Sequence, residues 1–130
     1  FGYRSSGLEG VIVLEAECAL SPDDPARIGE RIGGHMTRKR AAQDLWADGC
    51  GSLFKNPPAA IGMKAWQLID GAGFRGAFRG GAKISEKHAN FLVNTGQATF
   101  EDVAALIRDV QEGVMRKYHV FLEPEVRIIE

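Results

Sequence analysis

Hydrophobic and polar residues alternate near the start of the chain, from Val11 to Leu20. The even-numbered positions from Ile12 onward are apolar or small, whereas Glu15 and Glu17 fall on the opposite face. Successive side chains of a strand point to opposite faces, so an alternation of this kind marks a strand that buries one face. The pattern therefore predicts a half-buried β-strand in this part of the chain.

A helix is predicted to follow this strand. Asp24 can act as an N-cap, and Pro25 suits the first turn of a helix, where its missing N–H is not needed. Ile28, Ile32 and Met36 then recur every four residues, as apolar positions on one helical face do. We expect this helix to end at the basic residues that come next.

The middle of the chain mixes a long irregular segment with short elements. Residues 41–62 show neither a strand nor a helix period, so we expect a long loop there. Apolar residues at helical spacing predict a short helix from Ala65 to about Gly71. Short strands are expected around residues 83–85 and 91–93.

The longest helix is predicted to begin after Thr99, whose hydroxyl can cap its first turn. Asp102 stands three residues later, where a capping box prefers Glu, so a partial box is expected. Apolar residues then recur from Val103 to Val114. Two short extended pieces are expected to close the chain, at residues 120–122 and 126–129. This order of elements predicts an α+β fold, with a small mixed sheet and helices packed on one side of it.

Composition limits the classes of function. The chain has 130 residues, of which 45% are hydrophobic, and this suits one compact domain. Its 16 basic and 17 acidic residues nearly cancel, so neither nucleic acid nor an anionic membrane is an expected partner. No apolar run approaches the roughly 20 residues of a membrane helix. Cys18 and Cys50 lack the spacing of a metal site or a disulfide framework and are typical of thiols in a reducing cytoplasm. Because the sequence opens on Phe1 rather than methionine, we expect it to be cut from a longer protein.

A glycine motif, Gly71-Ala72-Gly73-Phe74-Arg75-Gly76, matches the dinucleotide-binding fingerprint in its letters. The fingerprint works only where a strand leads into the glycines and a helix leaves them, because the helix N-terminus receives the pyrophosphate. Here a helix is predicted to lead in and a strand to leave. We therefore interpret the motif as the end of a helix followed by a turn.

The most informative segment is Gly51-Ser52-Leu53-Phe54-Lys55-Asn56-Pro57. A hydroxyl and an amide lie close together there, and Asn-Pro favours an extended or turn geometry. Ser52 and Asn56 can therefore present their polar atoms to a ligand from one irregular loop. Such residues are equally ordinary in a solvated turn, so the segment does not name a function by itself.

Other candidates are also ambiguous when each is taken alone. The basic run that ends at Arg40 can contact a phosphate or form a solvated helix end, and His88 can be a ligand contact or a structural residue. Glu123 and Glu125 flank Pro124, and two carboxylates at this spacing crowd together unless the proline bends the chain. Glu125 can equally be a solvated charge.

Six segments together resemble one family, the UDP-N-acetylmuramate dehydrogenases, also called UDP-N-acetylenolpyruvoylglucosamine reductases. The resemblance runs in order from Tyr3 to Ile129. The segments are Tyr3-Arg4-x-Ser6, Gly51-Ser52-x-Phe54-Lys55-Asn56-Pro57, Ala65-Trp66-Gln67-Leu68-Ile69-Asp70, Gly80-Gly81-Ala82, Ser85-Glu86-Lys87-His88-Ala89-Asn90-Phe91 and Leu122-Glu123-Pro124-Glu125-Val126-Arg127.

This resemblance implies that residues 1–40 hold the last strand and helix of a FAD-binding region and that residues 41–130 form a C-terminal substrate-binding domain. It implies a cytoplasmic flavoenzyme of peptidoglycan precursor synthesis. In that family FAD takes a hydride from NADPH and passes it to UDP-N-acetylglucosamine enolpyruvate. The main flavin-binding segments would lie outside this chain, so the chain by itself is expected to be inactive.

The resemblance also implies roles for single residues. The family's catalytic residues correspond to Ser52, Glu125 and Arg4. Substrate contacts correspond to Asn56 and, by role rather than by identical residue in every member, to His88 and Arg40; Arg127 is expected to contact the cofactor. Two alternatives stay open, a non-catalytic domain that binds a UDP-sugar and a protein-interaction domain that merely resembles the family.

Overall fold

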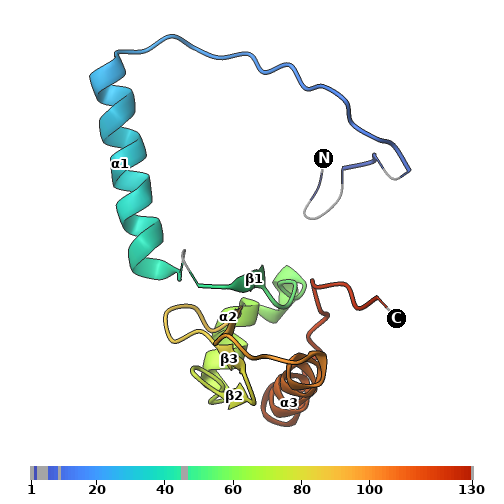
Figure 1. Cartoon of the computed structure of the whole chain (residues 1–130). Coiled ribbons are helices and arrows are strands. Elements are labelled where there is room, and N and C mark those ends of the chain that lie inside the picture. Colours follow the sequence, from blue (N-terminus) through green and yellow to red (C-terminus); the bar gives the residue numbers. More distant parts are fainter. Residues whose placement is uncertain (1, 3–5, 9, 45–46, 130) are drawn as a thin grey trace.

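The computed structural model describes residues 2, 6–8, 10–44 and 47–129 (Figure 1). Its helices and strands follow one another along the chain as α1 (Pro25–Ala42), β1 (Gly49–Ser52), the 3₁₀-helix η1 (Ala59–Ile61), α2 (Ala65–Gly71), β2 (Phe78–Arg79), β3 (Ala82–Ile84), β4 (Phe91–Asn94) and α3 (Phe100–Tyr118). The four strands form one sheet in the order β1-β4-β3-β2. This arrangement confirms the predicted α+β class, although every strand pair described is antiparallel and the sheet is therefore not mixed.

Strand β1 lies at one edge of the sheet and contains a bulge. Gly49 faces Val93 and Gly51 faces Leu92, so Cys50 is an extra residue without an opposite number on β4. Two glycines make the bulge possible. A side chain on Gly49 would clash with the carbonyl oxygen of Leu92, and Gly51 has a φ of +72°, which glycine adopts without strain.

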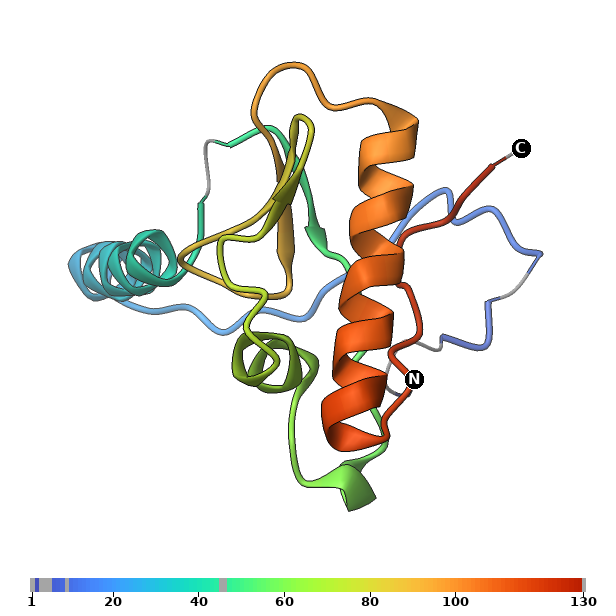
Figure 2. The ribbon, with the colours of Figure 1, turned by 90° about the horizontal axis from the view of Figure 1, so that it is seen from below.

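Helix α3 covers one face of the sheet (Figure 2). Thr99 caps it by accepting a hydrogen bond from the backbone N–H of Asp102, and the Asp102 carboxylate accepts one from Thr99 in return. The predicted capping box is therefore complete. The helix buries an apolar stripe against the sheet and α2, consisting of Ala104, Leu106, Ile107, Val110 and Val114.

The core lies between α3, α2 and the sheet. Fully buried side chains from each of these elements, and from the segment after β1, meet there, and burying one large apolar side chain stabilises a fold by roughly 1.5–3 kcal/mol. The largest of them are Leu53, Phe54, Leu68, Ile69, Ile84, Leu106 and Leu122. Leu53 and Phe54 directly follow Ser52, so core packing fixes the backbone on the C-terminal side of the serine.

Helix α1 was correctly predicted, with Asp24 as its N-cap and Pro25 in its first turn. It stands apart from the rest of the molecule and packs against none of the other described helices or strands (Figure 1). Its apolar residues Ile28 and Ile32 are 37% and 57% exposed. Both the sheet and the core are therefore built from residues after α1.

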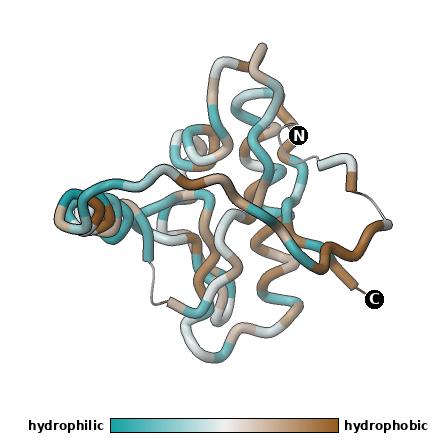
Figure 3. The backbone as a smooth tube through the Cα atoms, turned by 90° about the horizontal axis from the view of Figure 1, so that it is seen from above, coloured by the Kyte–Doolittle hydropathy of each residue, from teal (hydrophilic) through white to brown (hydrophobic). Residues whose placement is uncertain are grey.

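The strand predicted over residues 11–20 is wrong for this structure. The segment is extended, but it forms no ladder with the described residues, and Ile12 and Leu14 are 84% and 92% exposed. Figure 3 shows hydrophobic stretches along this uncovered segment. Alternation records only that one face is apolar; a strand also needs a neighbour that pairs with its backbone, and the described chain offers none here.

Three other segments of the chain can be compared with their predicted structure. The loop predicted over residues 41–62 contains β1 and η1, because glycine-rich β1 carries no apolar alternation for the sequence to show. The closing pieces predicted at residues 120–122 and 126–129 form no strands; Leu122 is buried in the core, and Pro124 makes a single bridge to Phe54. The glycine motif at 71–76 follows α2 and leads to β2, as predicted, so it is a helix end and a turn.

Among the described residues, no helix combines the length and the apolar character needed to cross a membrane. The longest helix, α3, carries charged residues at both ends and on its exposed face.

Gly81 should be among the residues least tolerant of substitution. A Cβ on Gly81 would clash with backbone atoms of Gln97 and Ala98, which cannot rotate away as a side chain can. We expect Gly81→Ala to lower the free energy of unfolding by about 1–3 kcal/mol, measured by thermal or urea denaturation. Gly33→Ala is the matched control, because its methyl group would enter open space on α1. Equal stability of the Gly81→Ala variant and the unaltered chain would contradict this account of the contact.

Asp102 should make stability depend on pH. Hydrogen bonds from the backbone N–H groups of Thr99 and Gly81 hold the pKa of Asp102 below its usual value. Its contribution is therefore fully present above the unfolded-state pKa of about 3.9 and is lost as the pH falls through the lower folded-state pKa.

We expect Asp102→Asn to be less stable than the unaltered chain at pH 7, and the gap between their melting temperatures to close as the pH falls below about 4. Glu101→Gln, in the same helical turn, serves as the control. A gap that stays constant down to pH 2 would show that the ionised form contributes nothing.

Candidate active site

Strand β1 delivers Ser52 to the end of the sheet. Ser52 is the last residue of β1, is half-buried and lies opposite Phe91 of β4. Beyond it the chain leaves the ladder, and the Leu53 N–H donates to the carbonyl oxygen of Asn90 over 2.7 Å. The serine therefore stands where regular pairing stops, next to a tightly held backbone.

The segment that carries Glu125 runs beside the residues that follow Ser52. The Glu125 N–H donates to the carbonyl oxygen of Leu53 over 2.8 Å, and the Lys55 N–H donates to that of Glu123 over 2.9 Å. Between these bonds, Phe54 forms an antiparallel bridge with Pro124. The structure thus brings together the backbones of two predicted site residues from distant parts of the sequence, Ser52 and Glu125.

The two glutamates of this segment have different surroundings. The Glu123 carboxylate is exposed and forms an ion pair with the Lys55 ammonium over 2.5 Å. Glu125 is half-buried. The two glutamates thus differ, because the carboxylate of Glu123 is paired with a cation at the surface whereas Glu125 is half-buried.

Cys50 is exposed on β1, two residues before Ser52. Partial loss of solvent around its thiol raises the pKa of Cys50, backbone hydrogen bonds at Cys50 and Leu92 lower it, and the carboxylate of Glu125 raises it by a smaller amount.

Asn90 holds the backbone after Ser52 from the other side. Its side chain is buried; Oδ1 accepts from the Phe54 N–H over 3.0 Å, and Nδ2 donates to the Phe54 carbonyl oxygen over 2.8 Å. No role was predicted for Asn90 from its place in the sequence. A polar residue between Ala89 and Phe91, at a position where a buried strand begins, was the available signal.

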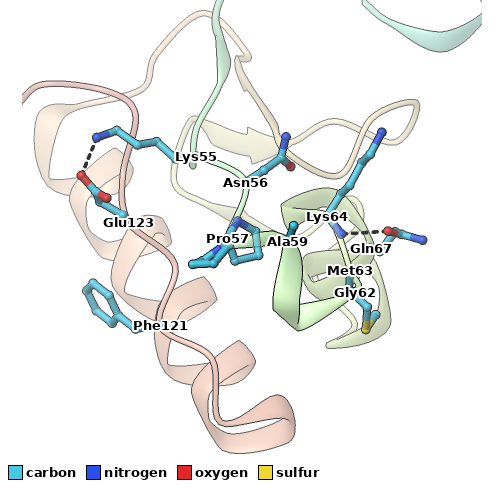
Figure 4. A pocket seen from close by; sticks show the side chains of 11 residues that line it. Lys55, Asn56, Pro57, Ala59, Gly62, Met63, Lys64, Gln67, Phe121 and Glu123 are labelled. Atoms are coloured by element: carbon cyan, nitrogen blue, oxygen red, sulfur yellow. Dashed lines mark hydrogen bonds and ion pairs between the residues drawn. The ribbon is translucent and has the colours of Figure 1, made fainter. Parts of the chain in front are cut away.

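Asn56 makes a structural hydrogen bond and also lines a groove. Its Oδ1 accepts from the N–H of Ala65, the first residue of α2, over 3.1 Å. Figure 4 shows Asn56 beside a groove of about 960 Å³ that lies between the start of α2 and the segment holding Phe121 and Glu123. Two lysines, Lys55 and Lys64, also line the groove. Ser52 and Glu125 are not among its lining residues.

His88 lies in an aromatic environment. Its ring is half-buried, with centroids 4.3 Å from Phe91 and 6.5 Å from Trp66. Its Nδ1 accepts from the Asn90 N–H over 3.3 Å. Burial lowers the pKa of His88, and the positive charge of Arg75 lowers it further. The imidazole is therefore neutral at pH 7, which leaves Nε2–H as its hydrogen-bond donor.

The structure does not bring every predicted residue to Ser52. Arg40 is exposed in the last turn of α1, and Arg127 is exposed after Glu125. Neither guanidinium makes a hydrogen bond or ion pair with any residue that the structure describes. Arg4 lies outside the described residues.

A second buried hydroxyl organises the loop before β4. Ser85 accepts hydrogen bonds from the N–H groups of Lys87 and His88, over 3.0 and 3.1 Å, and donates one to the Asp44 carboxylate. It thereby fixes the loop that presents His88.

Across residues 6–8, 10–44 and 47–129, no three His, Cys, Asp or Glu side chains are grouped as a metal site would require.

The comparisons with known proteins agree on one family. Residues 41–129 match the family model described as UDP-N-acetylenolpyruvoylglucosamine reductase, C-terminal domain. The chain is 46% identical over 129 residues to a UDP-N-acetylenolpyruvoylglucosamine reductase of Geobacter sulfurreducens, covering 98% of this chain and 42% of that protein. It is 47% identical over 130 residues to UDP-N-acetylenolpyruvoylglucosamine reductase 2 of Symbiobacterium thermophilum, covering 98% and 41%.

A solved structure agrees with these relatives. The crystal structure of UDP-N-acetylenolpyruvylglucosamine reductase from Thermus caldophilus superposes with a TM-score of 0.64 at 38% sequence identity, covering 82% of this chain and 36% of that one. The chain thus spans about two fifths of the length of the curated relatives it matches. The family model matches well over half of this chain, and the chain therefore belongs to the UDP-N-acetylenolpyruvoylglucosamine reductase family.

Proposed function

We propose that this chain is the C-terminal part of a cytoplasmic, FAD-dependent reductase that converts UDP-N-acetylglucosamine enolpyruvate to UDP-N-acetylmuramate with NADPH. Residues 41–130 would bind the substrate, and residues 1–40 would close the FAD-binding region. The observation that supports this most is the hydrogen bond from the Glu125 N–H to the carbonyl oxygen of Leu53, the residue that follows Ser52. Because the chain covers only about two fifths of its relatives, the activity belongs to a longer protein.

FAD, when bound, supplies the hydride that reduces the substrate. Arg127 is the residue of this chain that suits contact with it, because an exposed guanidinium close to Glu125 can bind an anionic group through several N–H donors. The remaining FAD contacts are expected from the longer protein.

Ser52 is proposed as the proton donor. Addition of a hydride to one carbon of the enolpyruvyl double bond breaks the π bond and leaves negative charge on the other carbon, delocalised into the substrate carboxylate. That carbon is strongly basic, so even a weak acid such as a serine hydroxyl can protonate it. The C–H bond that forms completes the reduction, and the serine regains its proton from water.

Arg4 and Glu125 are proposed to act on the substrate carboxylate. The guanidinium of Arg4 can donate to both carboxylate oxygens and offset the charge that develops there. An ionised Glu125 beside the same group would raise the barrier by repulsion, so we infer that Glu125 acts in its protonated form. Asn56, His88 and Arg40 would bind other parts of the substrate through their N–H donors.

The Ser52→Ala variant of the full-length protein tests the proton donor. We expect reduction of the flavin by NADPH to be unchanged and reoxidation by the enolpyruvyl substrate to slow by about 10²-fold or more, measured by stopped-flow absorbance. Cys50→Ala, on the same strand, is the control and should retain reoxidation. Equal reoxidation rates in Ser52→Ala and the unaltered protein would remove Ser52 from the mechanism.

The Glu125→Gln variant tests the protonated acid. Turnover at saturating substrate should decline as the pH rises and Glu125 loses its proton, and the decline should be absent in Glu125→Gln, because glutamine stays neutral at every pH. Glu123→Gln is the matched control, since Glu123 is exposed and paired with Lys55, and this variant should keep the decline. A decline that persists in Glu125→Gln would assign the titration to another group.

A further inference from the structure

The backbone polar groups of Leu53 and Phe54, and the N–H of Lys55, have hydrogen-bond partners, and one side chain supplies two of them. Leu53 and Lys55 are bonded through backbone groups of Asn90, Glu123 and Glu125. Phe54 is different, because both its N–H and its carbonyl oxygen are bonded by the side-chain amide of Asn90. The amide thus takes the place of a backbone peptide group from a neighbouring strand.

The side-chain amide of Asn90 is buried, and this indicates why it is there. Asn90 is only 4% exposed and lies among the apolar residues Ala89, Leu53 and Phe54. Packing alone would favour an apolar side chain at such a position, because a buried amide is costly unless its donor and acceptor are both satisfied. Its two bonds to one residue therefore point to a requirement for the position of that residue's backbone.

These two bonds from Asn90, called the clamp below, act on a residue close in the chain to Ser52 and next to the residue that bonds Glu125. Phe54 is two residues after Ser52, and the peptide groups on either side of it are the ones that bond Glu125 and Glu123. A shift of Phe54 would therefore move the Ser52 end of the segment relative to Glu125. Core packing of Leu53 and Phe54 holds these residues in place laterally, whereas the amide fixes them along the strand direction.

We propose that Asn90 is a positioning residue for the reduction step, holding the Ser52 hydroxyl in register with Glu125. The proposal rests on the proposed function, since it assigns Asn90 a role through Ser52. Asn90 need not touch the substrate for this role. Its effect should therefore be confined to the half-reaction in which the serine gives up its proton.

The test uses the full-length protein with Asn90→Asp and Asn90→Ala. Asn90→Asp keeps the side-chain volume and the acceptor oxygen but loses the donor to the Phe54 carbonyl, whereas Asn90→Ala loses both bonds. Rates are normalised to bound flavin, which counts only folded protein. We expect flavin reduction by NADPH to be unchanged and reoxidation by the enolpyruvyl substrate to fall about 10- to 100-fold, as for a small misplacement of a reacting group.

Asn94→Ala is the matched control. Asn94 lies at the other end of β4, and its Oδ1 also accepts two backbone N–H groups, those of Gly96 and Ala98. Its loss should lower the melting temperature without changing either half-reaction. Equal slowing of reoxidation in the Asn94→Ala and Asn90 variants would mean that general loosening of the strand is responsible, and would overturn the proposal.

A double-mutant cycle with Ser52→Ala separates this proposal from the proposed function. If Asn90 acts through Ser52, adding Asn90→Asp to Ser52→Ala should slow reoxidation no further, within about twofold. Slow Ser52→Ala with normal Asn90→Asp would overturn the positioning role and leave the function standing. Normal Ser52→Ala with slow Asn90→Asp would overturn the proton donor and with it the role of Asn90 through Ser52.

Amide hydrogen exchange in the unaltered protein tests the clamp even where a variant fails to fold. The Phe54 N–H should exchange as slowly as the core amides of β4, because its partner is a buried side chain. Exchange as fast as that of an exposed loop would overturn the proposal.

Discussion

Hydrogen bonds on both sides of residues 53–55 hold the site together. On one side the bonds go to Asn90, at the start of β4, and on the other to Glu123 and Glu125, near the end of the chain. These bonds replace a regular strand pairing at the point where β1 ends. Together with the ion pair between Lys55 and Glu123 and the burial of Leu53, Phe54 and Leu122 in one core, these bonds keep the serine and the half-buried glutamate on neighbouring segments.

The hydrogen-bonded segment at residues 53–55 also explains how a domain of this size can hold a site at the edge of its sheet. Leu53, Phe54 and Leu122 are fully buried, so the segments that carry Ser52 and Glu125 are anchored in the core next to their polar residues. Ser52 and Glu125 themselves are half-buried and polar. Buried apolar residues and polar site residues thus alternate along the chain. The free energy that holds the site in place comes mainly from the burial of the neighbouring apolar side chains.

Helices were easier to predict from the sequence than strands, for a physical reason. Caps such as Asp24 and Thr99 and the apolar stripe of α3 are local signals, because a helix bonds within itself. Strand β1 has almost no local signal, since Gly49 is required by the carbonyl of Leu92 on another strand and Gly51 by its positive φ. The error at residues 11–20 has the same origin, because alternation cannot say whether a pairing partner is present. The site motifs around Ser52 and Glu125 were recognisable, but the clamp by Asn90 is a contact between distant residues and could be found only in three dimensions.

The bulge in β1 has a consequence for the residues ahead of the serine. Cys50 is the additional residue between Gly49 and Gly51, so β1 uses four residues where the paired part of β4, from Phe91 to Val93, uses three. Gly49 and Ser52 both keep their partners on β4 in spite of this difference. A change of one residue in the chain length before Ser52 can thus be absorbed at the bulge, which leaves the pairing of the serine with Phe91 unaltered.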